Sequence, residues 1–161
     1  EKGEKEMLVK TKHFGEIELA EDKVLTFENG ILGFENQKHY TILYNNENET
    51  RSSISWLQSL EEPTLALPII HPDLVKEDYN PIVNEDALQS LGNLNEENQV
   101  VFVTLTVPSD LTKMTVNLKA PLVINKNNKK GCQLIAENSD YPVKFAVYEQ
   151  FQKLKETKGE Q

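Results

Sequence analysis

The sequence contains a single cysteine, Cys132, among its 161 residues. One thiol cannot form an intrachain disulfide, so no disulfide framework supports the fold. No segment approaches the ~20 consecutive apolar residues that a membrane-spanning helix needs. No basic start followed by an apolar block, the pattern of a secretory signal, is seen either. Together these absences predict a protein that works in the cytoplasm and makes no contact with a membrane.

Basic residues are also in short supply. Lys and Arg number 17 against 26 Asp and Glu, which gives a formal net charge of -9. Direct binding of nucleic acid uses basic side chains to displace counterions from phosphates, so this chain is a poor candidate for it. The same negative charge suits a basic protein partner, because complementary fields speed encounter. The alternative interpretation is that the acidity only keeps the chain soluble.

Patterns typical of catalytic and metal sites are absent. The three histidines, His13, His39 and His71, lie in different segments, without the close spacing of a metal-binding pair. No serine lies in a Gly-x-Ser-x-Gly elbow. The adjacent acids at 61–62 and 96–97 would point to opposite faces of a strand, so they do not form a two-carboxylate site. We therefore predict a protein that is not an enzyme and that needs no cofactor or metal.

What the sequence does contain is a block of β-branched residues at positions 100–125. Apolar runs occur at 100–107, 114–118 and 121–124, and such residues suit a pleated, half-buried surface. Pro108 closes the first run, because proline cannot donate to a strand ladder. The second run alternates apolar and polar residues with the period of two that marks a strand on a core. This block predicts the centre of an all-β core.

Similar short runs, separated by turn residues, occur along most of the chain. About nine or ten short strands and one short helix at 84–91 predict a small antiparallel β-barrel-like domain with one or two short helices. Asn29 and Gly30 indicate a turn, and the loop that follows should fold Ile31, Leu32 and Phe34 over one end of the barrel. Trp56 is expected in the core.

The last segment differs from the rest. Residues 145–155 contain no glycine or proline, and an apolar face is formed by Val147, Tyr148, Phe151 and Leu154. This pattern predicts a C-terminal amphipathic helix, which packs on its own barrel or, alternatively, docks on a partner or on a second copy. The expected organisation is a leader at 1–6, a barrel domain at 7–143 and a helical extension at 144–161.

Several of these stretches, in their order and spacing, resemble the bacterial flagellar assembly factor FliW family. They are LVKTKHFGEIEL at 8–19, LTFENGILGFE at 25–35, SWLQSLEEPTLALPIIHP at 55–72, TLTVPSDLTKMTVNLKAPLVIN at 104–125 and DYPV at 140–143. The resemblance implies a β-barrel-like protein without enzymatic activity. It also implies binding to the basic, RNA-binding translational repressor CsrA, which relieves repression of flagellin mRNA, and binding to flagellin itself.

The resemblance also suggests residues that carry binding. The candidates are Asn117, Leu118, Lys119 and Asn125 in the family-like block, with Glu61 and Glu62 for charge. Alternation along the strand places Leu118 toward the core, which weakens its candidacy. Family members commonly end soon after the DYPV-like segment, whereas this chain continues, so self-association through the extra helix is possible. The competing hypothesis is a small ligand-binding or hydrolytic β-barrel with a site at the barrel mouth.

Overall fold

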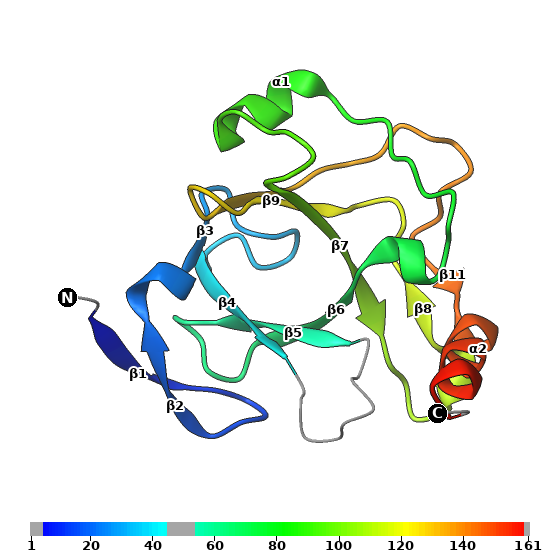
Figure 1. Ribbon diagram of the computed structural model, residues 1–161, viewed down its shortest axis with the longest axis horizontal. Helices are drawn as coiled ribbons and strands as arrows, with labels where there is room; N and C mark the ends of the chain where they lie inside the picture. The colour runs from blue at the N-terminus through cyan, green and yellow to red at the C-terminus, as the bar shows by residue number, and fades with distance from the viewer. Residues whose placement is uncertain (1–4, 45–53, 160–161) are drawn as a thin grey trace.

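The chain forms a closed barrel of seven strands in the part that the computed structural model describes, residues 5–44 and 54–159 (Figure 1). The barrel strands are β3 (Leu25–Phe27), β4 (His39–Tyr44), β5 (Ser55–Ser59), β6 (Ala66–Ile70), β7 (Gln99–Thr106), β9 (Leu122–Asn125) and β10 (Lys130–Gln133). Neighbours pair antiparallel except β3 and β10, which are parallel. The ring closes where β9 returns to β7, from Gln99 opposite Asn125 to Phe102 opposite Leu122. The predicted all-β barrel is confirmed.

Alternation along the strands fills the barrel interior. In β7, Phe102 points inward to a core cluster, while Val103 and Leu105 point outward to a second cluster. The inner cluster comprises Leu25, Phe27, Ile31, Tyr40, Leu57, Ile69, Phe102, Leu122 and Ile124. Because β7 is buried on both faces, its sequence reads as a continuous apolar run rather than an alternating one.

Two further apolar clusters cover the outside of the barrel. On one side, β8 (Thr115–Val116) pairs with β7, and β11 (Phe145–Ala146) pairs with β8. On another side, the predicted short helix is confirmed as α1 (Glu85–Leu88), followed by a 3₁₀ turn, and Leu91 packs with Val123 and Leu134. Further 3₁₀ turns occupy Glu21–Lys23, Pro72–Leu74 and Leu111–Lys113.

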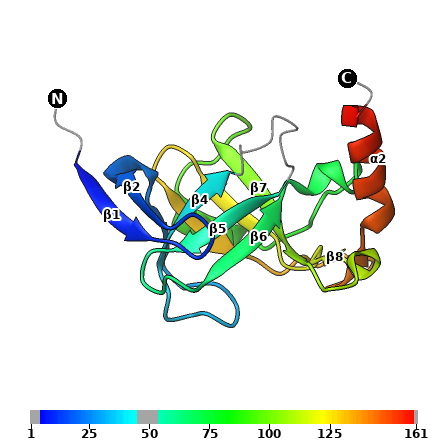
Figure 2. The ribbon, with the colours of Figure 1, turned by 90° about the horizontal axis from the view of Figure 1, so that it is seen from below.

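A hairpin of β1 (Glu6–Lys10) and β2 (Glu16–Ala20) stands beside the barrel, on the side away from the C-terminal helix (Figure 2). Gln58 on β5 ties it to the barrel, since its Oε1 accepts a 3.0 Å hydrogen bond from the Lys12 N–H. The Gln58 amide also donates to the carbonyl of Pro63, so a buried polar group is satisfied at both ends. Residues 1–4 of the expected leader lie outside the described residues.

The C-terminal segment begins differently from the prediction. The helix was expected from position 145, but Phe145–Ala146 forms β11, and α2 runs over Tyr148–Gly159. The N–H of Val147 donates to the Met114 carbonyl, which extends the strand pairing up to the helix start. Val147 is fully buried, and Phe151 packs against the same outer cluster. The segment therefore docks on its own domain at Val147, just before α2, and at Phe151 within α2, while self-association stays a prediction.

Trp56 does not lie in the core, contrary to the sequence prediction. Leu57 is fully buried inside the barrel, so the period of two along β5 turns its neighbour Trp56 to the outside. There the indole lies against the His13 ring of the hairpin loop, with 4.1 Å between the ring centroids. The sequence around Trp56 does not show which face of the strand this residue occupies, because that depends on the register of the strand in the sheet.

We expect Gly131→Ala to destabilise the barrel. A Cβ at this position would come within 2.6 Å of Cζ of Phe27, its fully buried cross-strand neighbour. The expected loss is about 1–3 kcal/mol in the free energy of unfolding, measured by urea denaturation. Phe27→Leu makes room for the methyl group, so Gly131→Ala should be less damaging in that background. Equal losses in both backgrounds would show that the contact is not responsible.

Candidate functional site

One end of the barrel collects acidic side chains, and we call it the acidic end. It is formed by the β3–β4 loop at 28–38 and the β5–β6 turn at 60–65. Its carboxylates belong to Glu28, Glu35, Glu61 and Glu62, all of which are exposed. The two segments are distant in sequence but adjacent in space, because β3, β4, β5 and β6 are consecutive antiparallel neighbours.

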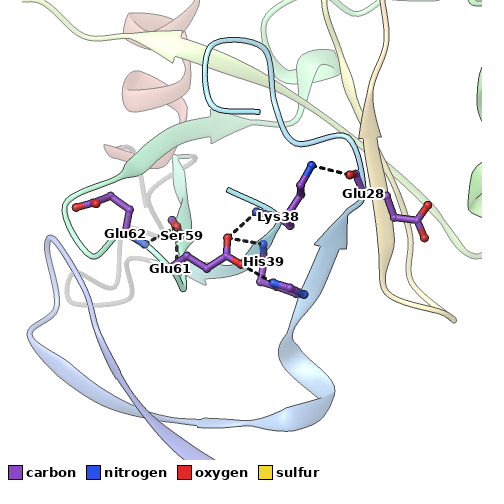
Figure 3. A network of polar contacts seen from close by, with 6 residues as sticks. All are labelled: Glu28, Lys38, His39, Ser59, Glu61 and Glu62. Carbon is purple, nitrogen blue, oxygen red and sulfur yellow. Dashed lines mark hydrogen bonds and ion pairs between the residues drawn. The ribbon is translucent and has the colours of Figure 1, made fainter. Parts of the chain in front are cut away.

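Glu61 links the two segments (Figure 3). Its Oε1 accepts a 2.6 Å hydrogen bond from the Lys38 N–H, and its Oε2 lies 2.8 Å from Nδ1 of His39. Burial raises the pKa of Glu61, but the hydrogen bonds from His39 and Lys38 outweigh it, so the net pKa is lowered. The carboxylate is therefore charged at neutral pH. The stability that it contributes is present above its ordinary pKa and is lost as pH falls through the lowered value.

The turn that carries Glu61 and Glu62 is fixed by Ser59. The Ser59 side chain is fully buried, and its Oγ accepts hydrogen bonds from the N–H groups of Glu61, at 3.1 Å, and Glu62, at 2.9 Å. The Glu62 carboxylate accepts a further bond from Thr64. Ser59 thus acts as a local cap, and the two carboxylates are held in place while they face solvent. Sequence spacing alone could not identify His39 as a partner of Glu61.

The loop at 28–38, which Glu61 contacts at Lys38, also exposes apolar side chains. As expected, Ile31 is buried in the barrel core, but Leu32 is 56% exposed and Phe34 is 39% exposed. Gly30 has a φ of 69°, and a Cβ there would meet the Glu35 backbone at 2.6 Å. Only glycine fits this close approach, and the resulting tight loop turns Leu32 and Phe34 outward. The sequence prediction that all three residues cover the core is correct only for Ile31.

The candidates from the family-like block lie elsewhere and serve structural roles. Leu118 is fully buried, and Asn125 is 2% exposed. The Asn125 amide donates to the Leu91 carbonyl at 2.8 Å and accepts from the Asn127 N–H. Neither side chain is available on the surface of the folded chain, so we leave both out of the candidate site.

Asn117 and Lys119 are partly buried in the turn that leads to β9. The Asn117 side chain accepts hydrogen bonds from the N–H groups of Lys119 and Ala120, and the Lys119 ammonium donates to the Ala136 carbonyl at 3.2 Å. These hydrogen bonds give Asn117 and Lys119 a structural role, because both side chains stabilise the turn. Of the six candidates, the structure brings together only Glu61 and Glu62.

The described residues include neither a metal-ligand cluster nor an activated thiol. No group of three or more His, Cys, Asp or Glu among them is placed to hold a metal ion. Burial raises the pKa of the Cys132 thiol to about 11, so the thiol is neutral at physiological pH and is a weak nucleophile. Within the same residues, no helix is long and apolar enough to cross a membrane.

Comparison with known proteins identifies the family of this chain. Residues 7–147 match the family model described as FliW protein. The chain is 63% identical over 146 residues to the flagellar assembly factor FliW of Lachnoclostridium phytofermentans, covering 91% of this chain and 94% of the relative. It is 51% identical to the FliW of Lachnospira eligens, covering 89% and 95%.

A solved structure has the same fold. The crystal structure of a flagellar assembly factor FliW superposes with a TM-score of 0.80 at 31% identity, covering 88% of this chain and 96% of the other. The family resemblance seen in the sequence is thereby confirmed. With the family model, the curated relatives and the solved structure in agreement, the chain belongs to the FliW family of flagellar assembly factors.

Proposed function

We propose that this flagellar assembly factor binds a CsrA-type translational repressor through its acidic end and thereby relieves repression of flagellin mRNA. The observation that carries the proposal is the combination found there. The Glu61 carboxylate contacts the 28–38 loop at Lys38, the Glu62 carboxylate is held by Thr64, and the same loop exposes Phe34 and Leu32. An apolar centre with a charged rim is the usual anatomy of a protein interface. Because the repressor acts on mRNA, the proposed interaction takes place in the cytoplasm.

The negative charge of the chain supports the proposal of a basic partner. The chain carries a net charge of -9, and the acidic end adds local carboxylates to this field. An RNA-binding protein carries a basic surface to contact phosphates. Opposite charges accelerate its encounter with this chain. Once the complex has formed, the negative field of this chain repels RNA from the repressor, which gives a physical route to antagonism without any catalytic step.

The exposed apolar side chains supply the binding energy that surface charges lack. Exposed ion pairs contribute only about 0–1 kcal/mol each. A buried aromatic anchor contributes more, commonly about 2 kcal/mol or above when it is truncated. Phe34 is the exposed aromatic nearest in sequence to the Lys38 and His39 contacts of Glu61. We assign it the role of anchor, with the carboxylates at the rim.

The proposal includes a second protein partner, flagellin. In this scheme free flagellin binds the assembly factor, the repressor is released, and flagellin synthesis is again repressed. The family resemblance supports this part. Titration calorimetry of the chain with the CsrA and the flagellin of the same bacterium tests both interactions. Absence of heat with both folded partners would overturn the proposed function.

We expect Glu61→Gln/Glu62→Gln to weaken CsrA binding about threefold to tenfold at low ionic strength. Glutamine keeps a side-chain oxygen that can accept from the Lys38 N–H and from the Thr64 hydroxyl, and the backbone contacts with Ser59 are unchanged, but both charges are removed. Calorimetry at low and moderate salt measures the change, and the salt dependence of binding should become shallower.

The matched control is Glu96→Gln/Glu97→Gln, which removes the same charge from two exposed residues of another loop. It should leave CsrA binding nearly unchanged. Equal weakening by both pairs would mean that only net charge matters, and the acidic end would then lose its assignment as the binding surface.

We expect Phe34→Ala to weaken CsrA binding by more than about tenfold with little change in the free energy of unfolding. The ring is 39% exposed and does not belong to the barrel core, so its loss leaves the fold intact. Leu8→Ala is the control, since Leu8 is 67% exposed on the hairpin. Calorimetry and urea denaturation are run on both variants. Unchanged affinity for Phe34→Ala would place the apolar centre of the interface elsewhere.

A further inference from the structure

The hairpin beside the barrel has an unpaired edge along β1. Within residues 5–44 and 54–159, β1 is hydrogen-bonded to β2 alone, and the two strands form a sheet of their own. Figure 2 shows the hairpin projecting from the barrel, with β1 on its outer side. An unpaired edge is a template for a further strand, and a sheet of only two strands is marginally stable. The β1 edge is therefore a candidate surface for strand addition.

Every second residue of β1 directs its backbone groups to this edge. At one end of the hairpin the Glu21 N–H donates to the Lys5 carbonyl at 2.9 Å, and at the other the Thr11 N–H donates to the Gly15 carbonyl at 3.0 Å. In an antiparallel pair, residues that bond to the partner strand alternate with residues whose N–H and C=O groups face away. The groups of positions 6, 8 and 10 therefore face outward, where a new strand would bond to them.

The side chains at these positions lie on the exposed face of the hairpin. Val9 is buried and so marks the opposite face, whereas Glu6 and Lys10 are exposed. Leu8, midway between them, is 67% exposed, the largest fraction for any large apolar side chain in the part of the chain that the structure describes. The edge thus presents an apolar centre between one negative and one positive charge.

This order of side chains is self-complementary. When β1 of a second copy runs antiparallel along the edge with the two Leu8 residues opposite each other, Glu6 of each copy lies opposite Lys10 of the other. Positions 6, 8 and 10 then meet only one another, so each of these pairs can exchange two backbone hydrogen bonds. Opposite charges directly across a strand pair are stabilising. The arrangement is two-fold symmetric, as in most homodimers.

The same charges disfavour other occupants. A strand without charges at these places would leave Glu6 and Lys10 without partners, and charged side chains on an edge are a common protection against such pairing. The far edge of the hairpin is not self-complementary, because antiparallel pairing of β2 about Glu18 would place two glutamates opposite each other. A second β1 is therefore the occupant that the edge fits.

We propose that two copies of this chain associate through β1 and form a four-stranded antiparallel sheet in the order β2–β1–β1–β2. The contact is small, and a net charge of -9 on each copy opposes it. We therefore expect a weak dimer, with a dissociation constant on the order of 10–100 µM. The proposal is independent of CsrA binding and of α2, because neither the acidic end nor the C-terminal helix contains β1.

The test is sedimentation equilibrium of the full chain from about 5 to 500 µM in about 0.15 M salt. The average mass should rise with concentration from that of a monomer toward that of a dimer. Glu6→Lys and Lys10→Glu each place like charges opposite each other at both ends of the paired strands. Each variant alone should dimerise at least about tenfold more weakly than the unaltered chain.

A mixture of these two variants tests the register itself. In a mixed dimer every lysine that the first variant carries at positions 6 and 10 lies opposite a glutamate of the second. An equimolar mixture should therefore recover the average mass of the unaltered chain. The double variant Glu6→Lys/Lys10→Glu should recover it without a partner, because each copy again has opposite charges at the two positions.

Leu8→Lys provides a test that does not disturb the hairpin. The new side chain lies opposite Glu18 within the hairpin, which favours folding, but it meets its own copy across the two-fold axis. This variant should dimerise at least about tenfold more weakly, and the amide spectrum of each ¹⁵N-labelled variant verifies that its hairpin is folded. Glu97→Lys is the matched control, since it makes the same change of net charge as Glu6→Lys at an exposed residue of another loop.

Three results would overturn the proposal. The first is a monomer at every concentration of the unaltered chain. The second is undiminished dimerisation of Leu8→Lys, which would place self-association on another surface, such as α2. The third is a mixture that stays monomeric although the hairpins of both variants are folded. Loss in each single variant, recovery in the mixture and no effect of Glu97→Lys support the proposal.

Discussion

The pairing of β9 with β7 is the constraint on which the rest of this structure depends. β7 pairs with β6 and β9 to close the barrel, and its last residues pair with β8 outside the ring. Val103 and Leu105 pack outward while Phe102 packs inward, so one strand joins two cores. Closure removes the free edges of the barrel strands, which otherwise invite aggregation. It also leaves two ends where loops, turns and functional side chains gather.

The register between β4 and β5 determines how the acidic end is arranged. Tyr40 lies opposite Ser59 across β4 and β5, which brings the start of β4 next to the end of β5. The Glu61 carboxylate can then accept a hydrogen bond from the Lys38 N–H. The Ser59 Oγ accepts one from the Glu61 N–H and so fixes the turn. A shift of one residue in this register would turn Leu57 out of the core, so the position of Glu61 is coupled to barrel packing. The backbone of the candidate site is therefore connected by hydrogen bonds to the strands that flank it.

The sequence predicted the all-β fold and the short helix capped by Asn84, because these features follow from local periodicity and capping. It failed for Trp56, whose face depends on strand register. Asn125, chosen as a contact residue, is buried because its amide bridges to Leu91. Both failures concern contacts between residues far apart in the chain. Glu61 and Glu62 lie exposed in a turn as the sequence indicates, because a polar turn can be recognised without knowing the register, and their role in binding stays a prediction.

Opposite charge at the two ends is compatible with a net charge of -9 because the ends are far apart. The six residues of β4 span about 15–20 Å at ~3.3 Å per residue. Ions in physiological salt screen the field of a charge over about 8 Å, so Glu61 acts only weakly on Lys23 and Lys126 at the other end of the barrel. The potential near Lys126 can therefore be positive although the chain carries a net negative charge. A partner at the acidic end would then be little affected by these lysines, unless it is large enough to cover both ends of the barrel.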